Sequence, residues 1–152
     1  MEIYIRPLKR EDALTSYKWR NDPDIWKFTG SKPDRKITDD IELDWIRKVM
    51  KEENSKRFAI CLKRNDKYLG NVQLTNIKDG VAEFHIFIGE KKYWGKGIAT
   101  EATKQILGIA KYKLNLNEVY LFVKSENIAA VKAYQKIGFK KTGKPEEMRV
   151  YL

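Results

Sequence analysis

The sequence predicts a single α+β domain over residues 1–152, with a mixed, mostly antiparallel sheet of about seven strands and four helices. The length of 152 residues suits one domain. Hydrophobic residues make up 42% of the chain, which is enough for a core and more than a disordered chain carries. Strand-like and helix-like segments follow one another in the order βααβββαβαββ, without a repeat or a linker. These observations together favour one layered domain.

The N-terminal elements are predicted from the spacing of apolar residues. The expected elements are a strand from Ile3 to Arg6, helices from Glu11 to Arg20 and from Thr38 to about Lys51, and strands over 57–63, 68–77 and Val81 to Gly89. Pro7 ends the first strand because proline has no N–H for the ladder. Thr38 is suited to cap its helix. The stretch 22–38 is expected to be an irregular connection that is long enough to be functional.

The C-terminal elements are predicted in the same way. We expect a helix from Gly97 to about Lys113, a strand from Val119 to Val123, a helix over 126–137, and short strands over 139–142 and 148–152. Ser125 is suited to cap the second of these helices, and Gly138 fits the left-handed conformation at its C-terminus.

Charge and cysteine content narrow the class of protein. Lysine and arginine outnumber aspartate and glutamate by 31 to 21, and the net charge of +10 favours a partner that carries phosphate. The basic residues are spread evenly and match no nucleic-acid-binding motif, so nucleic acid is kept only as an alternative. The single cysteine, Cys61, supports neither a disulfide nor a metal cluster. The chain shows neither a secretory signal nor the ~20 apolar residues of a membrane span, so we expect a cytoplasmic protein without a membrane partner.

The stretch that carries chemistry runs from the strand ending at Gly89 into the helix beginning at Gly97. Gly95 and Gly97 lack a Cβ, so the backbone there can approach a ligand closely. The first turn of the helix offers unpaired N–H groups, and Lys92 and Lys96 add positive charge. The pattern predicts a phosphate cradle. It fits neither a P-loop nor a dinucleotide fingerprint, because the glycine spacing differs from both.

Two motifs resemble those of the GNAT superfamily of acetyl-CoA-dependent N-acetyltransferases. Lys92-Tyr-Trp-Gly-Lys-Gly97 resembles the family's Q/R-x-x-G-x-G/A motif, with Lys92 in place of the usual Gln or Arg. Residues 125–139 resemble its N-x-x-A-x-x-x-Y-x-x-x-G-F segment. The resemblance covers nearly the whole chain and is closest to the branch of ribosomal-protein-alanine, spermidine and nucleotide-linked amino-sugar acetyltransferases. It implies a three-layer α/β fold with a V-shaped splay between the fourth and fifth strands.

The resemblance also implies a donor site for acetyl-CoA, without a metal. The pantetheine arm would pair with the backbone of Phe87 and Ile88, and the N–H of Ile88 would face the thioester oxygen as a catalytic group. Asn127 would hydrogen-bond the pantetheine amide. The remaining residues expected at the donor are Lys92, Gly95, Lys96, Gly97, Ile98 and Ala99.

Three further residues are candidates for proton transfer. By the resemblance, Tyr134 maps onto the family's general acid, and its ordinary pKa near 10 suits protonation of a thiolate. Glu83 is the first candidate for the base, acting through a water. His85, on the same strand face, is the second. Each also has a structural interpretation: a core aromatic for Tyr134, a surface carboxylate for Glu83 and a structural histidine for His85.

The acceptor is predicted from the segment around Trp19, Arg20, Asn21 and Phe28. It resembles the acceptor-side loop of GNAT enzymes that act on nucleotide-linked amino sugars, and Glu83 and His85 would complete the site. A core position for Trp19 is the structural alternative. The favoured acceptor is a nucleotide-linked amino sugar or another small amine, and the alternative is the N-terminal alanine of a ribosomal or other acidic protein. A polyamine ranks third because the charge of +10 would repel it. A non-catalytic nucleic-acid-associated domain is the rival class, and a homodimer is left open.

Overall fold

The computed structural model describes residues 1–152 apart from the side chain of Phe28, and it contains one seven-stranded sheet. The strand order is β1-β2-β3-β4-β5-β7-β6. The strands are β1 (Ile3–Pro7), β2 (Lys56–Leu62), β3 (Tyr68–Lys78), β4 (Val81–Ile88), β5 (Glu118–Phe122), β6 (Lys140–Lys141) and β7 (Glu147–Tyr151). The β4–β5 pair is parallel, and the other neighbours are antiparallel. The predicted mixed, mostly antiparallel sheet is confirmed.

The helices agree with the prediction except in one place. They are α1 (Ala13–Arg20), α2 (Pro23–Thr29), α3 (Asp39–Met50), α4 (Ile98–Tyr112) and α5 (Ile128–Ile137), with 3₁₀ turns η1 (Arg10–Asp12) and η2 (Lys91–Tyr93). Helix α2 lies within the stretch that was expected to be irregular, so the described chain has five α-helices instead of four. Pro23 occupies the first turn of α2, where a proline N–H is not needed, and Asp22 caps the helix. Residues 31–38 are irregular as expected.

The helix caps show how local sequence sets these boundaries. The hydroxyl of Thr38 accepts the N–H of Ile41 at 3.2 Å, which confirms Thr38 as the cap of α3. For α5, the prediction of Ser125 was wrong by two residues, because the Asn127 side chain accepts the N–H of Ala130 at 3.3 Å. Asparagine and serine cap about equally well, so the sequence alone could not separate them.

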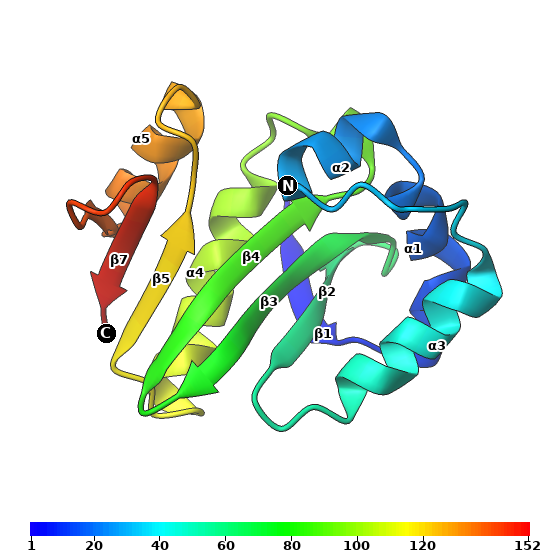
Figure 1. The fold of residues 1–152 in the computed structure, drawn as a ribbon, viewed down its shortest axis with the longest axis horizontal. Coiled ribbons are helices and arrows are strands. Elements are labelled where there is room, and N and C mark those ends of the chain that lie inside the picture. Colours follow the sequence, from blue (N-terminus) through cyan, green and yellow to red (C-terminus); the bar gives the residue numbers. More distant parts are fainter.

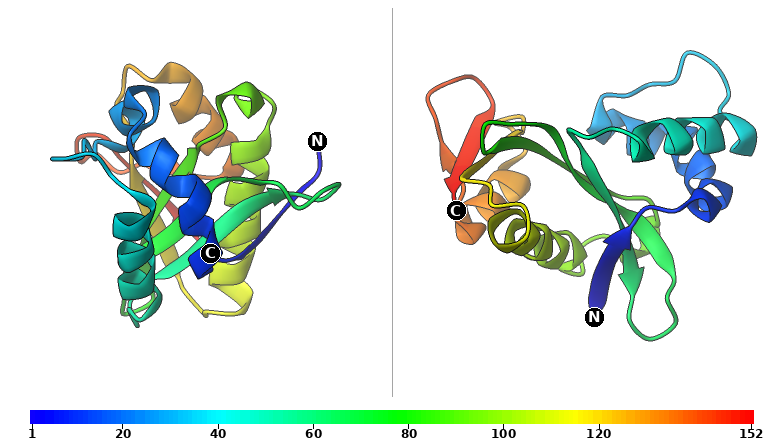
Figure 2. Two further views of the ribbon diagram at one scale, coloured as in Figure 1. Left: turned by 90° about the vertical axis from the view of Figure 1, so that its right-hand side faces the viewer. Right: turned by 90° about the horizontal axis from the view of Figure 1, so that it is seen from below.

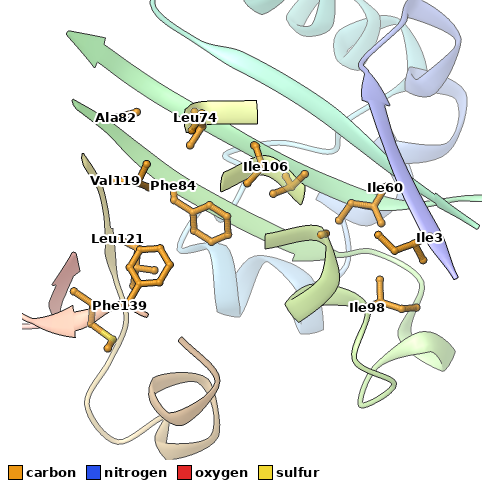
Figure 3. Packing of buried hydrophobic residues seen from close by; sticks show 14 of the residues in the cluster. Ile3, Ile60, Leu74, Ala82, Phe84, Ile98, Ile106, Val119, Leu121 and Phe139 are labelled. Carbon is orange, nitrogen blue, oxygen red and sulfur yellow. The ribbon is translucent and has the colours of Figure 1, made fainter. Parts of the chain in front are cut away.

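The hydrophobic core lies between the sheet and helices α4 and α5. Ile106 of α4 and Phe84 of β4 meet there, and Leu121 and Phe139 close its far end (Figure 3). Helices α1, α2 and α3 lie on the opposite side of the sheet (Figure 2). None of the described helices is long and apolar enough to cross a membrane.

The parallel pair β4–β5 opens towards one end of the sheet. Its register stops at Glu83↔Tyr120, whereas the pairing of β3 with β4 continues to Ile88. Strand β5 continues to pair with β7 as far as Phe122. The two halves of the sheet therefore diverge beyond Glu83, and Figure 1 shows this V. The predicted splay between the fourth and fifth strands is confirmed.

Candidate active site

The turn that leads into α4 has the conformation expected of a phosphate cradle. Gly95 and Gly97 have φ of +73° and +79°, values that favour glycine because a Cβ is strained there. A Cβ at either position would meet no protein atom within 4 Å, so both glycines face open space. Gly97 caps α4 without a side-chain hydrogen bond, so the first N–H groups of α4 are oriented towards that space. The buried side chain of Ile98 anchors the turn to the core.

A groove of about 600 Å³ continues from this turn between α4 and α5. Gly97 lies at its start, and Lys104, Lys132 and Lys136 line it together with one acidic residue, Glu101. Lysine charges beside the positive end of a helix dipole favour a polyanion such as the nucleotide end of coenzyme A. Sequence analysis did not single out these three lysines. For two of them a signal was available: Lys132 and Lys136 are four residues apart, a spacing that puts both side chains on one face of a helix.

The opened edge of β4 is where the second part of the predicted donor site would lie. Gly89 N–H donates to the carbonyl of Leu69 on β3 at 2.7 Å. Backbone groups of successive residues in a strand point to alternate edges. The N–H and C=O of Ile88 therefore point away from β3, into the gap that β5 leaves. This direction fits the predicted role of the Ile88 N–H, and the indole Nε1 of Trp94 donates to the Ile88 carbonyl at 2.8 Å.

Tyr134 of α5 lies on the core side of this gap. Its ring packs edge to face against Phe84 and Phe139, with centroid distances of 6.0 and 5.7 Å. Burial raises the pKa of its hydroxyl above the ordinary value of 10. The group therefore keeps its proton at neutral pH, as a proton donor requires. Asn127, the N-cap residue of α5, uses its side-chain oxygen in the cap, so its amide NH₂ is the group suited to donate to a ligand.

Glu83 and His85 lie on the other face of β4. The Glu83 carboxylate accepts from Asn76 Nδ2 at 3.2 Å and from the Tyr120 hydroxyl at 3.4 Å, and His85 Nε2 lies 3.0 Å from its second oxygen. The Glu83 side chain is 17% exposed and that of His85 is 46% exposed. Burial lowers the pKa of His85, with a smaller contribution from Arg57, while Glu83 acts in the opposite direction. The neutral imidazole favoured by this shift is the form that can accept a proton.

Tyr120 and Asn76 are members of this cluster that the sequence analysis missed. Tyr120 alternates with the core residues Val119 and Leu121 on β5, so its outward direction was readable from the sequence. Its place beside Glu83 depends on the parallel register of β4 and β5, which no local pattern encodes.

The acceptor-side residues predicted on α1 make their described contacts inside the protein. Trp19 is 5% exposed, and its ring lies against Gly89 and packs edge-on to Phe87 with a centroid distance of 6.0 Å. Arg20 pairs with the buried Glu42 at 2.7 Å. The Asn21 side chain bonds both the N–H and the carbonyl of Ile37. Trp19 thus packs against the end of β4, whereas Arg20 and Asn21 bind α3 and the segment before it. The side chain of Phe28 lies outside the described residues.

An ion-pair network joins η2, which leads into the Gly95–Gly97 turn, to helix α2. Lys91 Nζ, in η2, lies 2.9 Å from a carboxylate oxygen of Asp22 and 2.9 Å from one of Asp24. Lys92 and Lys96 are exposed near it, and the Lys92 ammonium lies 5.5 Å from the ring centroid of Tyr93. No group of three or more His, Cys, Asp or Glu suited to hold a metal occurs among the described residues.

The candidate residues lie on both sides of the point where the β4–β5 pairing ends. Tyr134 approaches the gap from the face covered by α4 and α5, and Glu83 and His85 lie on the other face.

The profile of the family described as "Acetyltransferase (GNAT) domain" matches residues 2–140. The chain belongs to the GNAT acetyltransferase family. It is accordingly an N-acetyltransferase, and enzymes of this family take the acetyl group from acetyl-CoA.

Individual GNAT relatives cover most of this chain. The spermidine N(1)-acetyltransferase of Escherichia coli is 32% identical over 145 residues, which are 93% of this chain and 74% of that protein. An uncharacterized N-acetyltransferase, p20, of Bacillus licheniformis is 28% identical over 144 residues, 93% of this chain and 80% of that protein.

Solved structures show the same fold. The spermidine N-acetyltransferase of Vibrio cholerae in complex with CoA and spermine has a TM-score of 0.87 at 24% identity, and the match covers 98% of this chain and 95% of that one. A domain from Methanocaldococcus jannaschii has a TM-score of 0.80 at 27% identity and covers 99% of both chains. The nucleotide-linked amino sugar that ranked first as acceptor has no support among these relatives.

Proposed function

We propose that this GNAT enzyme transfers the acetyl group of acetyl-CoA directly to a primary amine of a polyamine such as spermidine. The observation that supports direct transfer is the gap beyond Glu83, with a proton donor on one face and proton acceptors on the other. The polyamine is supported by the E. coli spermidine N(1)-acetyltransferase, which is 32% identical.

The net charge does not argue against this acceptor once the lysines are placed. Lys104, Lys132 and Lys136 line the groove between α4 and α5, and Lys96 lies in the turn before it. These charges face the donor side, where a polyanion would bind. On the opposite face Glu83 offers a carboxylate, a group that an ammonium or amine would approach. The overall charge of +10 is a property of the whole chain, so it does not give the local charge at the acceptor face.

The proposed reaction assigns one task to each group. The N–H of Ile88 would bind the thioester oxygen and stabilise its charge as the neutral amine attacks the carbonyl carbon. Glu83 or His85 would take the proton that the amine nitrogen loses as the N–C bond forms. Tyr134 would give its proton to the sulfur as the C–S bond breaks. The products are the acetylated amine and free coenzyme A, and solvent returns both side chains to their starting states.

A comparison of acceptors tests this proposal. Release of free thiol from acetyl-CoA would be followed with spermidine, with an amino-sugar nucleotide and with an acidic peptide that begins with alanine. We expect the highest kcat/KM with spermidine. The Tyr134→Phe variant should release thiol about 100-fold more slowly than the unmodified enzyme. A higher kcat/KM with either other amine would overturn the polyamine assignment. Titration calorimetry tests the rival class. If the protein bound duplex DNA and did not bind CoA, a non-catalytic domain would be favoured.

A further inference from the structure

Trp94 makes a contact that links the two halves of the donor site. It lies between Lys92 and Gly95, and its side chain is partly exposed. Its indole Nε1 donates to the carbonyl oxygen of Ile88 at 2.8 Å. Ile88 is the last residue of β4, at the edge left open by β5. One side chain of the phosphate turn thus reaches the backbone at which the thioester is proposed to be held.

The peptide between Ile88 and Gly89 is consequently held from both sides. The N–H groups of Gly89 and Glu90 both donate to the Leu69 carbonyl on β3, at 2.7 and 3.2 Å. On the opposite side, Trp94 binds the Ile88 carbonyl. A peptide held at both edges cannot rotate without breaking one of these hydrogen bonds. The position of the preceding Ile88 N–H is fixed with it, because both groups belong to the same extended residue.

We propose that Trp94 is a positioning residue that couples diphosphate binding in the Gly95–Gly97 turn to the placement of the thioester at Ile88. The inference rests on the proposed use of acetyl-CoA at this edge. Trp94 immediately precedes Gly95, so a diphosphate bound by this turn would hold the indole against the Ile88 carbonyl. Binding free energy gained far from the reacting atoms then contributes to their alignment, which raises kcat.

The coupling can be measured with two donors that differ in the diphosphate. Acetyl-CoA carries it, and S-acetylpantetheine carries the same thioester without the diphosphate or nucleotide. Trp94→Phe keeps an aromatic ring and removes the N–H donor. We expect this change to lower kcat/KM for acetyl-CoA about fivefold to tenfold, the effect of one hydrogen bond. For S-acetylpantetheine we expect less than about a twofold change, because no diphosphate would then hold the turn that precedes α4.

A matched control is Trp26→Phe, the same chemical change in α2, where the ring contacts Lys32. This variant should leave kcat/KM unchanged for both acetyl-CoA and S-acetylpantetheine. An equal loss with both donors after Trp94→Phe would overturn the proposal, since Trp94 would then only shape the strand end. Tighter binding of CoA by this variant would also overturn it, because the indole would then compete with the pantetheine arm.

A second measurement applies to acetyl-CoA alone. The proposal requires that Trp94→Phe lower kcat while the calorimetric Kd of CoA changes less than about threefold, with the melting temperature unchanged within about 2 °C. A rise in this Kd that accounts for the whole loss of kcat/KM contradicts the coupling. Absence of acetyl transfer by the unmodified enzyme would instead reject the proposed function, so the two failures are distinguishable.

Discussion

The rings of Tyr134 and Phe84 meet edge to face, with 6.0 Å between their centroids and an interplanar angle of 82°. Phe84 is the first residue of β4 beyond the last β4–β5 pair, so this contact places Tyr134 at the point where the sheet opens. The contact needs only the ring. The hydroxyl can therefore be removed without loss of the packing, and its chemical role can be tested separately from its structural one.

Tyr134→Phe should lower kcat for acetyl transfer about 100-fold, the typical contribution of a general acid, with little change in the Kd of CoA. The melting temperature should stay close to that of the unmodified enzyme because Phe84 and Phe139 keep their ring contacts. Tyr112→Phe is the control, since Tyr112 is 76% exposed at the end of α4. Unchanged kcat in the Tyr134 variant would remove this hydroxyl from the mechanism.

Gly97→Ala and Gly108→Ala should have opposite effects on stability, although both glycines belong to α4 or its cap. Gly97 has a φ of +79°, which alanine adopts at a cost of about 1–2 kcal/mol. Gly108 lies inside the helix with nothing within 4 Å of an added Cβ, so alanine there should stabilise by about 0.5–1 kcal/mol. Only Gly97→Ala should weaken CoA binding. Urea unfolding and calorimetry measure the two effects, and equal behaviour of both variants would contradict the cradle.

Much of the fold was predictable because the relevant signals are local. The alternation of Glu83, His85 and Phe87 with core residues identified β4 and its two faces. The glycines at 95 and 97 identified the turn before α4. Helix α2 was not predicted because a proline usually interrupts a helix, although Pro23 also suits the first turn of a new one.

The arrangement of the site required the tertiary structure. Glu83 and Tyr120 are 37 residues apart and meet only through the parallel register of β4 and β5. The ion pair of Arg20 was equally hidden, because its partner Glu42 lies on another helix. A motif can thus be located from sequence, whereas its partners depend on pairings between distant segments.

Arg20→Met distinguishes a structural role for Arg20 from acceptor binding. The Glu42 side chain is 2% exposed, and its oxygens bind Arg20 and Ser16 at 2.7 Å each. Loss of the guanidinium leaves a buried carboxylate poorly paired, so we expect a destabilisation of about 3 kcal/mol in urea unfolding. The KM for spermidine should stay unchanged below the melting temperature. A raised KM without destabilisation would place Arg20 in the acceptor site instead.

The control for Arg20 is Arg47→Met in helix α3. The Arg47 guanidinium lies 4.0 Å from Asp44, and both side chains are largely exposed. An exposed pair of this kind contributes little, so the free energy of unfolding should change by less than about 1 kcal/mol. A similar loss in both variants would show that burial of Glu42 does not determine the effect.

His85 should make the protein less stable under mild acid. Burial lowers its pKa in the folded state below the ordinary 6.5, so between these two values the unfolded chain binds more protons than the folded one. The free energy of unfolding therefore rises with pH across this interval, and the contribution of His85 decreases it on acidification.

Two charged neighbours modify the pKa of His85. Glu83, which accepts hydrogen bonds from Asn76 and Tyr120, raises it, and Arg57, whose guanidinium donates to Gln73 beside His85, lowers it. His85 is the only histidine, so urea unfolding of His85→Gln between pH 5 and 7 should show a weaker pH dependence than the unmodified protein. The same pH dependence in the unmodified protein and in the variant would contradict this prediction. It would mean that His85 has the same pKa in the folded and unfolded states, so that burial does not lower it.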